Sequence, residues 1–329
     1  MFKLSCNIEI TGNKKWSFGA VKNLEIVEDV SVLTDTCEIE LPKNIIWKGD
    51  EDFTDGKPPI KRGDKIDVWL GYDDQLKKRF TGYIRSISQQ TPIVIKCEDS
   101  MFLLKQTKLT PKAFKDAKLS DLISYLLQGT GISFKLIDNE IKLGNYRITK
   151  PTIAQELQEL KDHYLLSSYF RTLDEKDYLY IGLTYPFDNR KHVKFEHGKN
   201  IITEDFEYRA AEDIRARVQA QSFDAKNKKT TIEIGDKDGD LIEIRIDGLT
   251  ESELTKYAKQ ALLRYKTSGL KGSFKAFGEP SVRKCDIVDI ITSDGNTGNY
   301  LIKKNTINFG TDGFRQDIEI GTPLETNDG

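Results

Sequence analysis

The stretches KRGDKIDV (residues 61–68) and RKCDIVDI (residues 283–290) share one pattern. Each begins with a short polar turn, passes through an aspartate, Asp64 or Asp286, and continues into an apolar strand. Downstream, FTGYI (80–84) parallels NTGNYL (296–301), with a glycine at 82 or 298 opening the next strand. The Asp-to-Gly separation is 18 residues in the first copy (64 to 82) and 12 in the second (286 to 298), a difference that a hairpin loop absorbs. The repeat predicts two copies of one small β-barrel.

The sequence around both copies has the two-residue period of half-buried strands. Apolar residues occupy positions 2, 4, 6, 8 and 10, and polar residues stand between them. Further strands are predicted at 21–29, 35–41, 65–71, 79–88 and 93–98. After residue 190 they are predicted at 192–195, 202–208, 213–224, 230–234, 241–247, 286–292, 299–309 and 314–320.

The middle of the chain has a different character. Helical spacing predicts a helix over 119–128, ended by the GTG at 129–131, and a second over about 152–164 with Pro151 near its first turn. Strands are predicted at 132–137, 166–173 and 178–184. Near the C-terminal end, Thr250 and Glu253 form a capping-box pattern that predicts a helix at about 250–268.

We therefore predict a β-rich α+β fold with two similar antiparallel β-barrel domains and an α+β module between them. The first barrel is expected to cover 1–106, the α+β domain 107–188, and the second barrel 189–329, including the helix at about 250–268.

Composition excludes several classes of protein. Fifty Lys and Arg face 52 Asp and Glu, so the chain lacks the basic excess typical of a nucleic-acid binder. The longest apolar runs are far shorter than the roughly 20 residues that span a bilayer, and no apolar leader is expected at the N-terminus. The four scattered cysteines, without a CxxC pair, predict buried thiols made in a reducing compartment: Cys6, Cys37, Cys97 and Cys285.

No constellation of residues predicts catalysis. The sequence has no GxSxG elbow, no phosphate-binding GxxxxGK[ST] and no GxGxxG after a strand, and it has only three histidines. The best candidate for a metal site is an EF-hand-like series of acids: Asp236, Asp238, Asp240 and Asp247. Leu241 stands where such a loop needs glycine, so we expect a hairpin turn with solvated acids. We predict no catalytic, cofactor-binding or metal-binding residues, and a structural or interaction protein.

One segment resembles a known family. FEHGKNI (195–201) is similar to the aromatic-x-x-Gly-x-Asn-Ile step of the phage late control D family, the hub proteins of contractile-tail baseplates. The capped helix, the 283–286 turn, GNYLI (298–302) and GF (313–314) follow in that family's order. The family commonly has Pro-Gly-Asp at this turn, where this chain has Lys284, Cys285 and Asp286. The hub part of the valine-glycine repeat (VgrG) spikes of type VI secretion belongs to the same group.

The resemblance implies a homotrimer whose six barrels form a quasi-sixfold ring between a threefold spike and the sixfold tail tube. It implies these partners: the chain itself, a tail spike protein, a tail tube or tube-initiator protein and other baseplate proteins, with no membrane, and with DNA at most passing through the channel. The expected location is the virion tail baseplate, after synthesis in the bacterial cytoplasm. Only residues 323–329 follow the last predicted strand, so a stand-alone hub with a separate spike is expected.

Two alternatives belong to other classes. A tail-associated cell-wall hydrolase would need an extra domain, and no unassigned block and few histidines are available for one. A particle-borne carbohydrate-binding adhesin fits poorly with free cysteines and the absence of a visible secretion signal.

Overall fold

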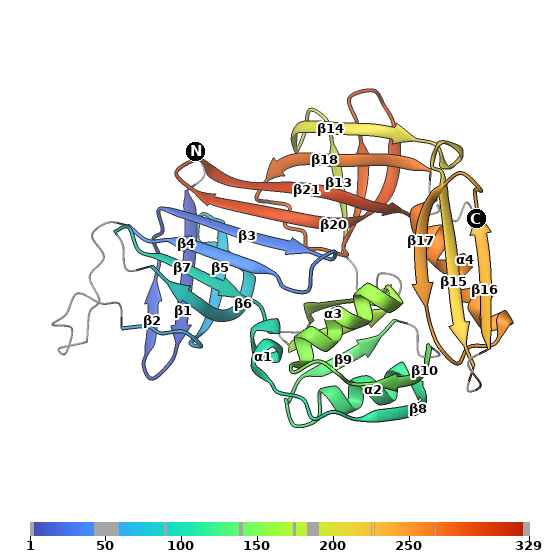
Figure 1. Cartoon of the computed structure of the whole chain (residues 1–329). Helices are drawn as coiled ribbons and strands as arrows, with labels where there is room; N and C mark the ends of the chain where they lie inside the picture. Colours follow the sequence, from blue (N-terminus) through green and yellow to red (C-terminus); the bar gives the residue numbers. More distant parts are fainter. Residues whose placement is uncertain are drawn as a thin grey trace.

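Most of the chain is built from strands, and the strands of the two ends belong to one sheet (Figure 1). The computed structural model describes residues 3–42, 59–88, 91–137, 141–173, 176–182, 191–224, 226, 228–266 and 268–324. The N-terminal half (3–98) supplies β1 (Leu4–Thr11), β2 (Lys15–Phe18), β3 (Asn23–Asp29), β4 (Thr36–Glu40), β5 (Lys65–Tyr72), β6 (Gln75–Ile87) and β7 (Val94–Glu98). Its apolar side chains alternate along the strands and gather in a core that includes Ile8, Ile26 and Ile66.

The C-terminal half (191–209 and 269–324) continues this sheet. It supplies β13 (His192–Glu196), β14 (Ile201–Arg209), β18 (Gly269–Phe277), β19 (Ile287–Ile291), β20 (Thr297–Gly310) and β21 (Gly313–Pro323). Among the described residues, the sheet has 13 strands and its main path runs β14-β18-β21-β20-β3-β4-β7-β6-β5-β1-β2, while β19 pairs with β13 and β20. Within this part of the chain the pairing joins the two halves through β20 and β3 without closing either half into a barrel.

The middle segment (101–182) contains helices and two small sheets. Its elements are α1 (Met101–Gln106), β8 (Ala113–Lys118), α2 (Leu119–Leu126), β9 (Ser133–Leu136), β10 (Lys142–Arg147), α3 (Ile153–Tyr164), β11 (Ser167–Leu173) and β12 (Lys176–Gly182). The Thr152 side chain accepts a hydrogen bond from the Gln155 N–H and so caps α3. In the described residues, β10 pairs with β8, and β12 lies between β11 and β9.

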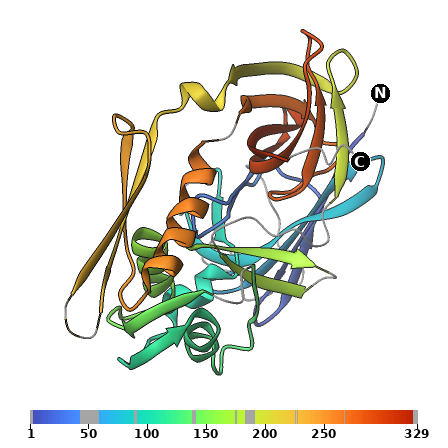
Figure 2. The ribbon, with the colours of Figure 1, turned by 90° about the vertical axis from the view of Figure 1, so that its right-hand side faces the viewer.

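An insertion (210–266) separates β14 from β18 in the sequence. It comprises the 3-10 turn Ala211–Asp213, β15 (Ala216–Phe223), β16 (Lys229–Gly235), β17 (Asp240–Arg245) and α4 (Glu251–Tyr265). The predicted capping box is present, because Thr250 and Glu253 each accept a hydrogen bond from the other's backbone N–H. Figure 2 shows the long strands of the insertion standing at one side of the molecule, with α4 inside them.

The insertion shares its hydrophobic core with the middle segment. Val218, Ile244 and Leu254 are buried in the same cluster as Leu122 and Leu157. The backbones also approach closely, because a Cβ on Gly144 would collide with the Asp247 carbonyl oxygen. The α4 helix therefore packs with the α+β segment, while the predicted boundaries at 106/107 and 188/189 stay predictions.

The structure has the predicted fold class and also contains elements that the sequence did not reveal. A β-rich α+β fold is confirmed. The elements not predicted are α1, β2, β8, β10 and β18. Strand β18 has the sequence GLKGSFKAF, and its two glycines, Gly269 and Gly272, have positive φ angles of 144° and 132°. These glycines interrupt the apolar alternation that marks a strand in a sequence.

Candidate assembly site at the joint between the two halves

The two repeated turns have the same hydrogen bonds. The Lys61 N–H donates to the Asp64 carboxylate at 2.9 Å, and the Arg283 N–H donates to the Asp286 carboxylate at 2.9 Å. In each turn the aspartate N–H donates back to the same residue, and the residue before the aspartate has positive φ, 91° at Gly63 and 67° at Cys285. The repeat inferred from the sequence is thus present in the geometry of both turns.

The strands that follow the turns also correspond. Ile84 exchanges backbone hydrogen bonds with the Gly63–Asp64 turn as Ile302 does with the Cys285–Asp286 turn. A register shift comes directly after each isoleucine, between Ile84 and Ser86 and between Ile302 and Lys304. The β5-β6-β7-β4-β3 order of the first half therefore matches β19-β20-β21-β18-β14 of the second.

The glycine correspondence expected from the sequence is wrong by two residues. Gly82 lies opposite Ile66, and the residue in the equivalent place, opposite Val288, is Tyr300. A Cβ on Gly82 would lie 2.7 Å from the Phe80 ring, and one on Gly298 would lie 2.6 Å from the Tyr300 ring. In each copy a glycine therefore lies beside an aromatic ring two residues away, because side chains two apart on a strand share a face. The order along the chain is opposite: Phe80 precedes Gly82, whereas Gly298 precedes Tyr300.

Strands β3 and β20 form the backbone part of the joint between the halves. They pair antiparallel from Asp29 opposite Lys304 to Asn23 opposite Gly310. Ile307 and Phe309, together with Phe314 of β21, pack in the core of the N-terminal half. The β20–β21 hairpin, which lies beside β3 (Figure 1), thus contributes side chains to the core of the neighbouring half.

Buried polar side chains also connect the two halves through hydrogen bonds. The guanidinium of Arg79, which is 2% exposed, donates to Gln316 Oε1 at 2.9 Å and to the Gly278 carbonyl at 3.3 Å. Gln316 in turn donates to the carbonyls of Phe277 and Pro280. Burial lowers the pKa of Arg79 to about 10, so this side chain stays charged at neutral pH.

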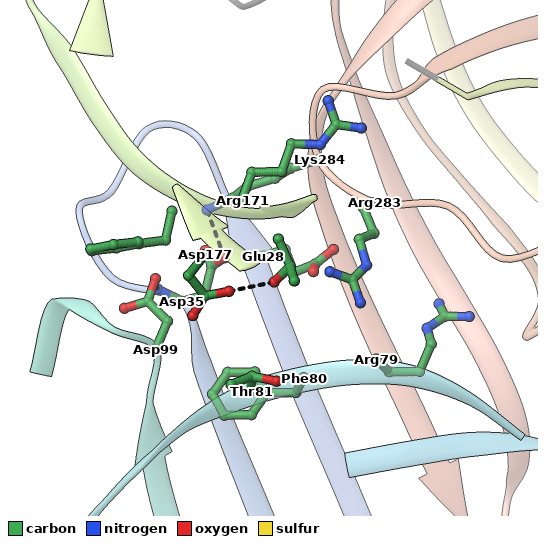
Figure 3. Close-up of a pocket in the computed structure, with 12 residues that line it drawn as sticks. Glu28, Asp35, Arg79, Phe80, Thr81, Asp99, Arg171, Asp177, Arg283 and Lys284 are labelled. Atoms are coloured by element: carbon green, nitrogen blue, oxygen red, sulfur yellow. Dashed lines mark hydrogen bonds and ion pairs between the residues drawn. The ribbon is translucent and has the colours of Figure 1, made fainter. Parts of the chain in front are cut away.

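Buried charges gather where both halves meet the middle segment (Figure 3). We call these side chains, all 8% exposed or less, the charge joint: Glu28, Asp35, Arg79, Asp99, Arg171, Lys284 and Asp286. Lys284 Nζ lies 2.6 Å from Asp35 Oδ2, and an Arg171 guanidinium nitrogen lies 2.5 Å from Asp286 Oδ1. Arg171 belongs to β11, so the second pair ties the middle segment to the C-terminal turn.

Burial perturbs the acids of the charge joint. It raises the pKa of Asp99 to about 8, with a further contribution from the Asp35 carboxylate. Burial also raises the pKa of Glu28 and of Asp35, against the opposing effect of nearby cations. Burial alone would lower the pKa of Lys284, but Asp35 and Asp99 outweigh it and the pKa is raised. The Lys284 ammonium is therefore charged, and Asp99 is largely protonated at neutral pH.

The acids predicted to lie at a hairpin tip do not lie in a hairpin. Strands β16 and β17 flank β15 on opposite sides, so residues 236–239 cross the end of β15. Asp236 accepts from the Ala216 N–H and pairs with Lys266 at 2.6 Å, while Asp238 pairs with Arg215. The sequence could not distinguish this crossing from a hairpin because both need a short polar turn between two strands.

The described residues contain no group of three or more His, Cys, Asp or Glu side chains arranged to hold a metal ion. In the same part of the chain, the helices all fall short of the length and apolar character needed to cross a membrane.

Comparison with solved structures gives matches over nearly the whole chain. A tail protein from Neisseria meningitidis MC58 superposes with a TM-score of 0.70 and 14% identity, covering 98% of this chain and 97% of that one. The chain has the fold of a phage tail protein. The 43 kDa tail protein of prophage MuSo2 from Shewanella oneidensis gives a TM-score of 0.67 and 14% identity, covering 97% and 98%.

A component of the Escherichia coli type VI secretion system, described as similar to the T4 tail proteins gp27 and gp5, has the same fold. Its TM-score is 0.61 at 11% identity, and the match covers 97% of this chain and 77% of that one. No protein-family model and no curated protein matches the sequence. The relationship is thus visible in the fold.

The charge joint could not be recognised in the sequence. Arg79 and Lys284 stand in polar turns and strand ends, where basic side chains are usually solvated. A weak signal was present at Cys285, which replaces the glycine expected at a position of positive φ. The partners of these side chains lie on strands far apart in the sequence, so no local pattern could reveal their burial.

Proposed function

We propose that this chain is a structural baseplate hub of a contractile phage tail or a phage-like injection device. The observation that carries the proposal is a tail-protein fold over 98% of the chain, combined with an internal repeat whose two copies share their turn hydrogen bonds. A similar fold occurs in a type VI secretion component and in complexes of VgrG from Francisella. The proposed role needs no catalytic, cofactor-binding or metal-binding residue.

The finer architecture belongs to the same proposal. We propose that each half is one copy of a repeated β unit, that the chain divides into 1–106, 107–188 and 189–329, and that three chains form a homotrimer that presents six similar units. Separate hydrophobic cores in the two halves support the two units. Such a ring would join a threefold spike to a sixfold tube within the virion tail, next to other baseplate proteins.

Light scattering and negative-stain imaging of the purified chain test the proposal. We expect a trimer mass and a closed ring with six lobes. A chain that remains monomeric even with its spike protein present would refute the hub, and a measurable cell-wall hydrolysis that a surface Asp, Glu or His substitution abolishes would favour the enzyme alternative.

A further inference from the structure

The outer edge of β14 is exposed, although β14 corresponds to a strand that is covered. Its counterpart β3 has β4 on one side and β20 on the other, whereas among the described residues β14 pairs along its length only with β18. Figures 1 and 2 both show β14 at the margin of the sheet. Unpaired strand edges expose backbone donors and acceptors and readily accept another strand.

Matching residues identify which part of β14 is uncovered. Ile26 of β3 lies opposite Cys37, and Phe206 of β14 lies opposite Gly272. Strand β18 is the counterpart of β4, and β21 is the counterpart of β7. Extending the β18–β21 pairing by one residue puts Gly272 opposite Ile320, as Cys37 lies opposite Cys97 in the first half. Ile26 therefore corresponds to Phe206.

The same register matches Glu28 to Tyr208, two residues further along. Glu28, which lies on the strand beside β20, is 6% exposed, whereas Tyr208 is 65% exposed. The unpaired edge of β14 therefore has an exposed aromatic ring where the corresponding position of β3 is covered.

The strand that corresponds to β20 is β6. In β20 the residues after the register shift, Lys304 and Asn305, lie opposite Asp29 and Glu28. Their counterparts in β6 are Ser86 and Ile87, which follow the same shift and pair with β7 on one side. Strand β5 ends its pairing with β6 at Tyr83, so the other side of Ser86–Ser88 has no partner strand among the described residues.

We propose that β14 of one copy pairs antiparallel with the end of β6 of a second copy, with Tyr208 opposite Ile87. This inference rests on the proposed ring and names the edges that close it. Its basis is that the chain already makes the equivalent contact internally, between β3 and β20. A head-to-tail contact of this kind uses two different surfaces of each copy and closes when the rotation between units permits.

The side chains suit an association between separate molecules. Inside the chain the equivalent pair is polar, Glu28 opposite Asn305, and both are buried. Between copies the pair becomes Tyr208 opposite Ile87, an aromatic and β-branched combination that favours cross-strand pairing. Burial of the exposed Tyr208 ring supplies an apolar driving force that a covalently linked joint does not need.

Cross-linking of the full chain tests the pairing. Tyr208→Cys and Ile87→Cys are made as separate variants, mixed and mildly oxidised, since directly opposed residues lie within the Cα separation that a disulfide accepts. The matched control mixes Glu207→Cys with Ile87→Cys, because residue 207 points to the opposite face of the strand. We expect a disulfide-linked species with the first mixture and little with the second. A variant carrying both Tyr208→Cys and Ile87→Cys should give a cross-linked ladder that stops at three copies.

The outcomes separate this inference from the hub proposal. A trimer mass without the Tyr208–Ile87 cross-link, or with equal yields from the control, overturns the edge pairing and leaves the hub intact. A ladder that passes three copies supports the pairing but refutes the closed trimer, and a chain that is monomeric at every concentration refutes both. Tyr208→Asp should also weaken association at least about tenfold, or about 1.4 kcal/mol, while Tyr265→Asp on α4, also an exposed tyrosine, should leave it unchanged.

Discussion

The Asp64 turn and the Asp286 turn have the same backbone but different surroundings. Each aspartate accepts the N–H of the residue three positions earlier at 2.9 Å. In the part of the chain that the structure describes, Asp286 alone of the two also receives a buried guanidinium, that of Arg171, at 2.5 Å. A repeated local motif can therefore have equal geometry and unequal importance, because the middle segment places a buried guanidinium beside Asp286, whereas it meets the Asp64 turn through the ring of Phe102 beside Arg62.

The largest expected difference is between alanine substitutions at these two aspartates. Asp286→Ala breaks the buried ion pair between Asp286 and Arg171, so we expect a loss of about 3–5 kcal/mol in the free energy of unfolding. Asp64→Ala removes turn hydrogen bonds and should cost about 1 kcal/mol. Urea unfolding at neutral pH measures both. Asp286→Asn, which keeps an acceptor for the Arg283 N–H, should fall between them, and equal losses at 64 and 286 would contradict the comparison.

The insertion is a second difference between the halves, since its counterpart is the short turn between β3 and β4. Leu254 of α4 is fully buried in the core that the insertion shares with the middle segment, and Leu254→Ala should cost about 2–5 kcal/mol. Leu262, which is only partly buried, should cost less. Hydrogen exchange should show faster exchange in α2 and α3 but not in β5. Loss of protection in β5 as well would mean that the first half depends on the insertion.

The charge joint predicts that the stability of the chain depends on pH. Asp99 has a pKa raised to about 8 in the folded chain, above its usual value near 4, so the folded state binds the extra proton between these pH values. The contribution of Asp99 to the free energy of unfolding is therefore largest toward pH 4–5 and is lost as the pH rises to 8.

For the wild-type chain we expect a fall of up to about 4 kcal/mol between pH 5 and 8, because this interval spans three pH units below the folded pKa of about 8 and each unit corresponds to about 1.4 kcal/mol. Asp99→Asn should reduce the fall, while Asp294→Asn, on an exposed turn, should leave it as in wild type. Urea midpoints at the two pH values provide the measurement. An unchanged fall in Asp99→Asn would assign the effect to other groups.

The smallest expected effect concerns the residue before each aspartate. Gly63 has φ of 91° and open space around its missing Cβ, so Gly63→Ala should cost about 1–2 kcal/mol through the backbone alone. Cys285 already occupies this conformation with a buried side chain. Thermal unfolding of Gly63→Ala measures the cost. No loss of stability would show that the backbone at 63 can relax in a way that the buried 285 position cannot.

The sequence alone determined the local elements. Alternating apolar residues marked β1 and most later strands, and Thr250 with Glu253 marked the start of α4, because periodicity and capping depend on neighbouring residues. The aspartates of the two turns also revealed the repeat. The glycines misled the alignment by two residues, since Gly82 and Gly298 sit on opposite sides of their aromatic partners.

Only the tertiary structure decided which surfaces meet. The pairing of β3 with β20, the packing of α4 against the middle segment and the burial of Lys284 beside Asp35 all join residues distant in the sequence. A lysine in a polar turn has the same local pattern whether it is solvated or buried, and its environment is set by strands that fold over it from elsewhere in the chain. Long-range contacts thus decide the joint, although short-range rules decide the strands that form it.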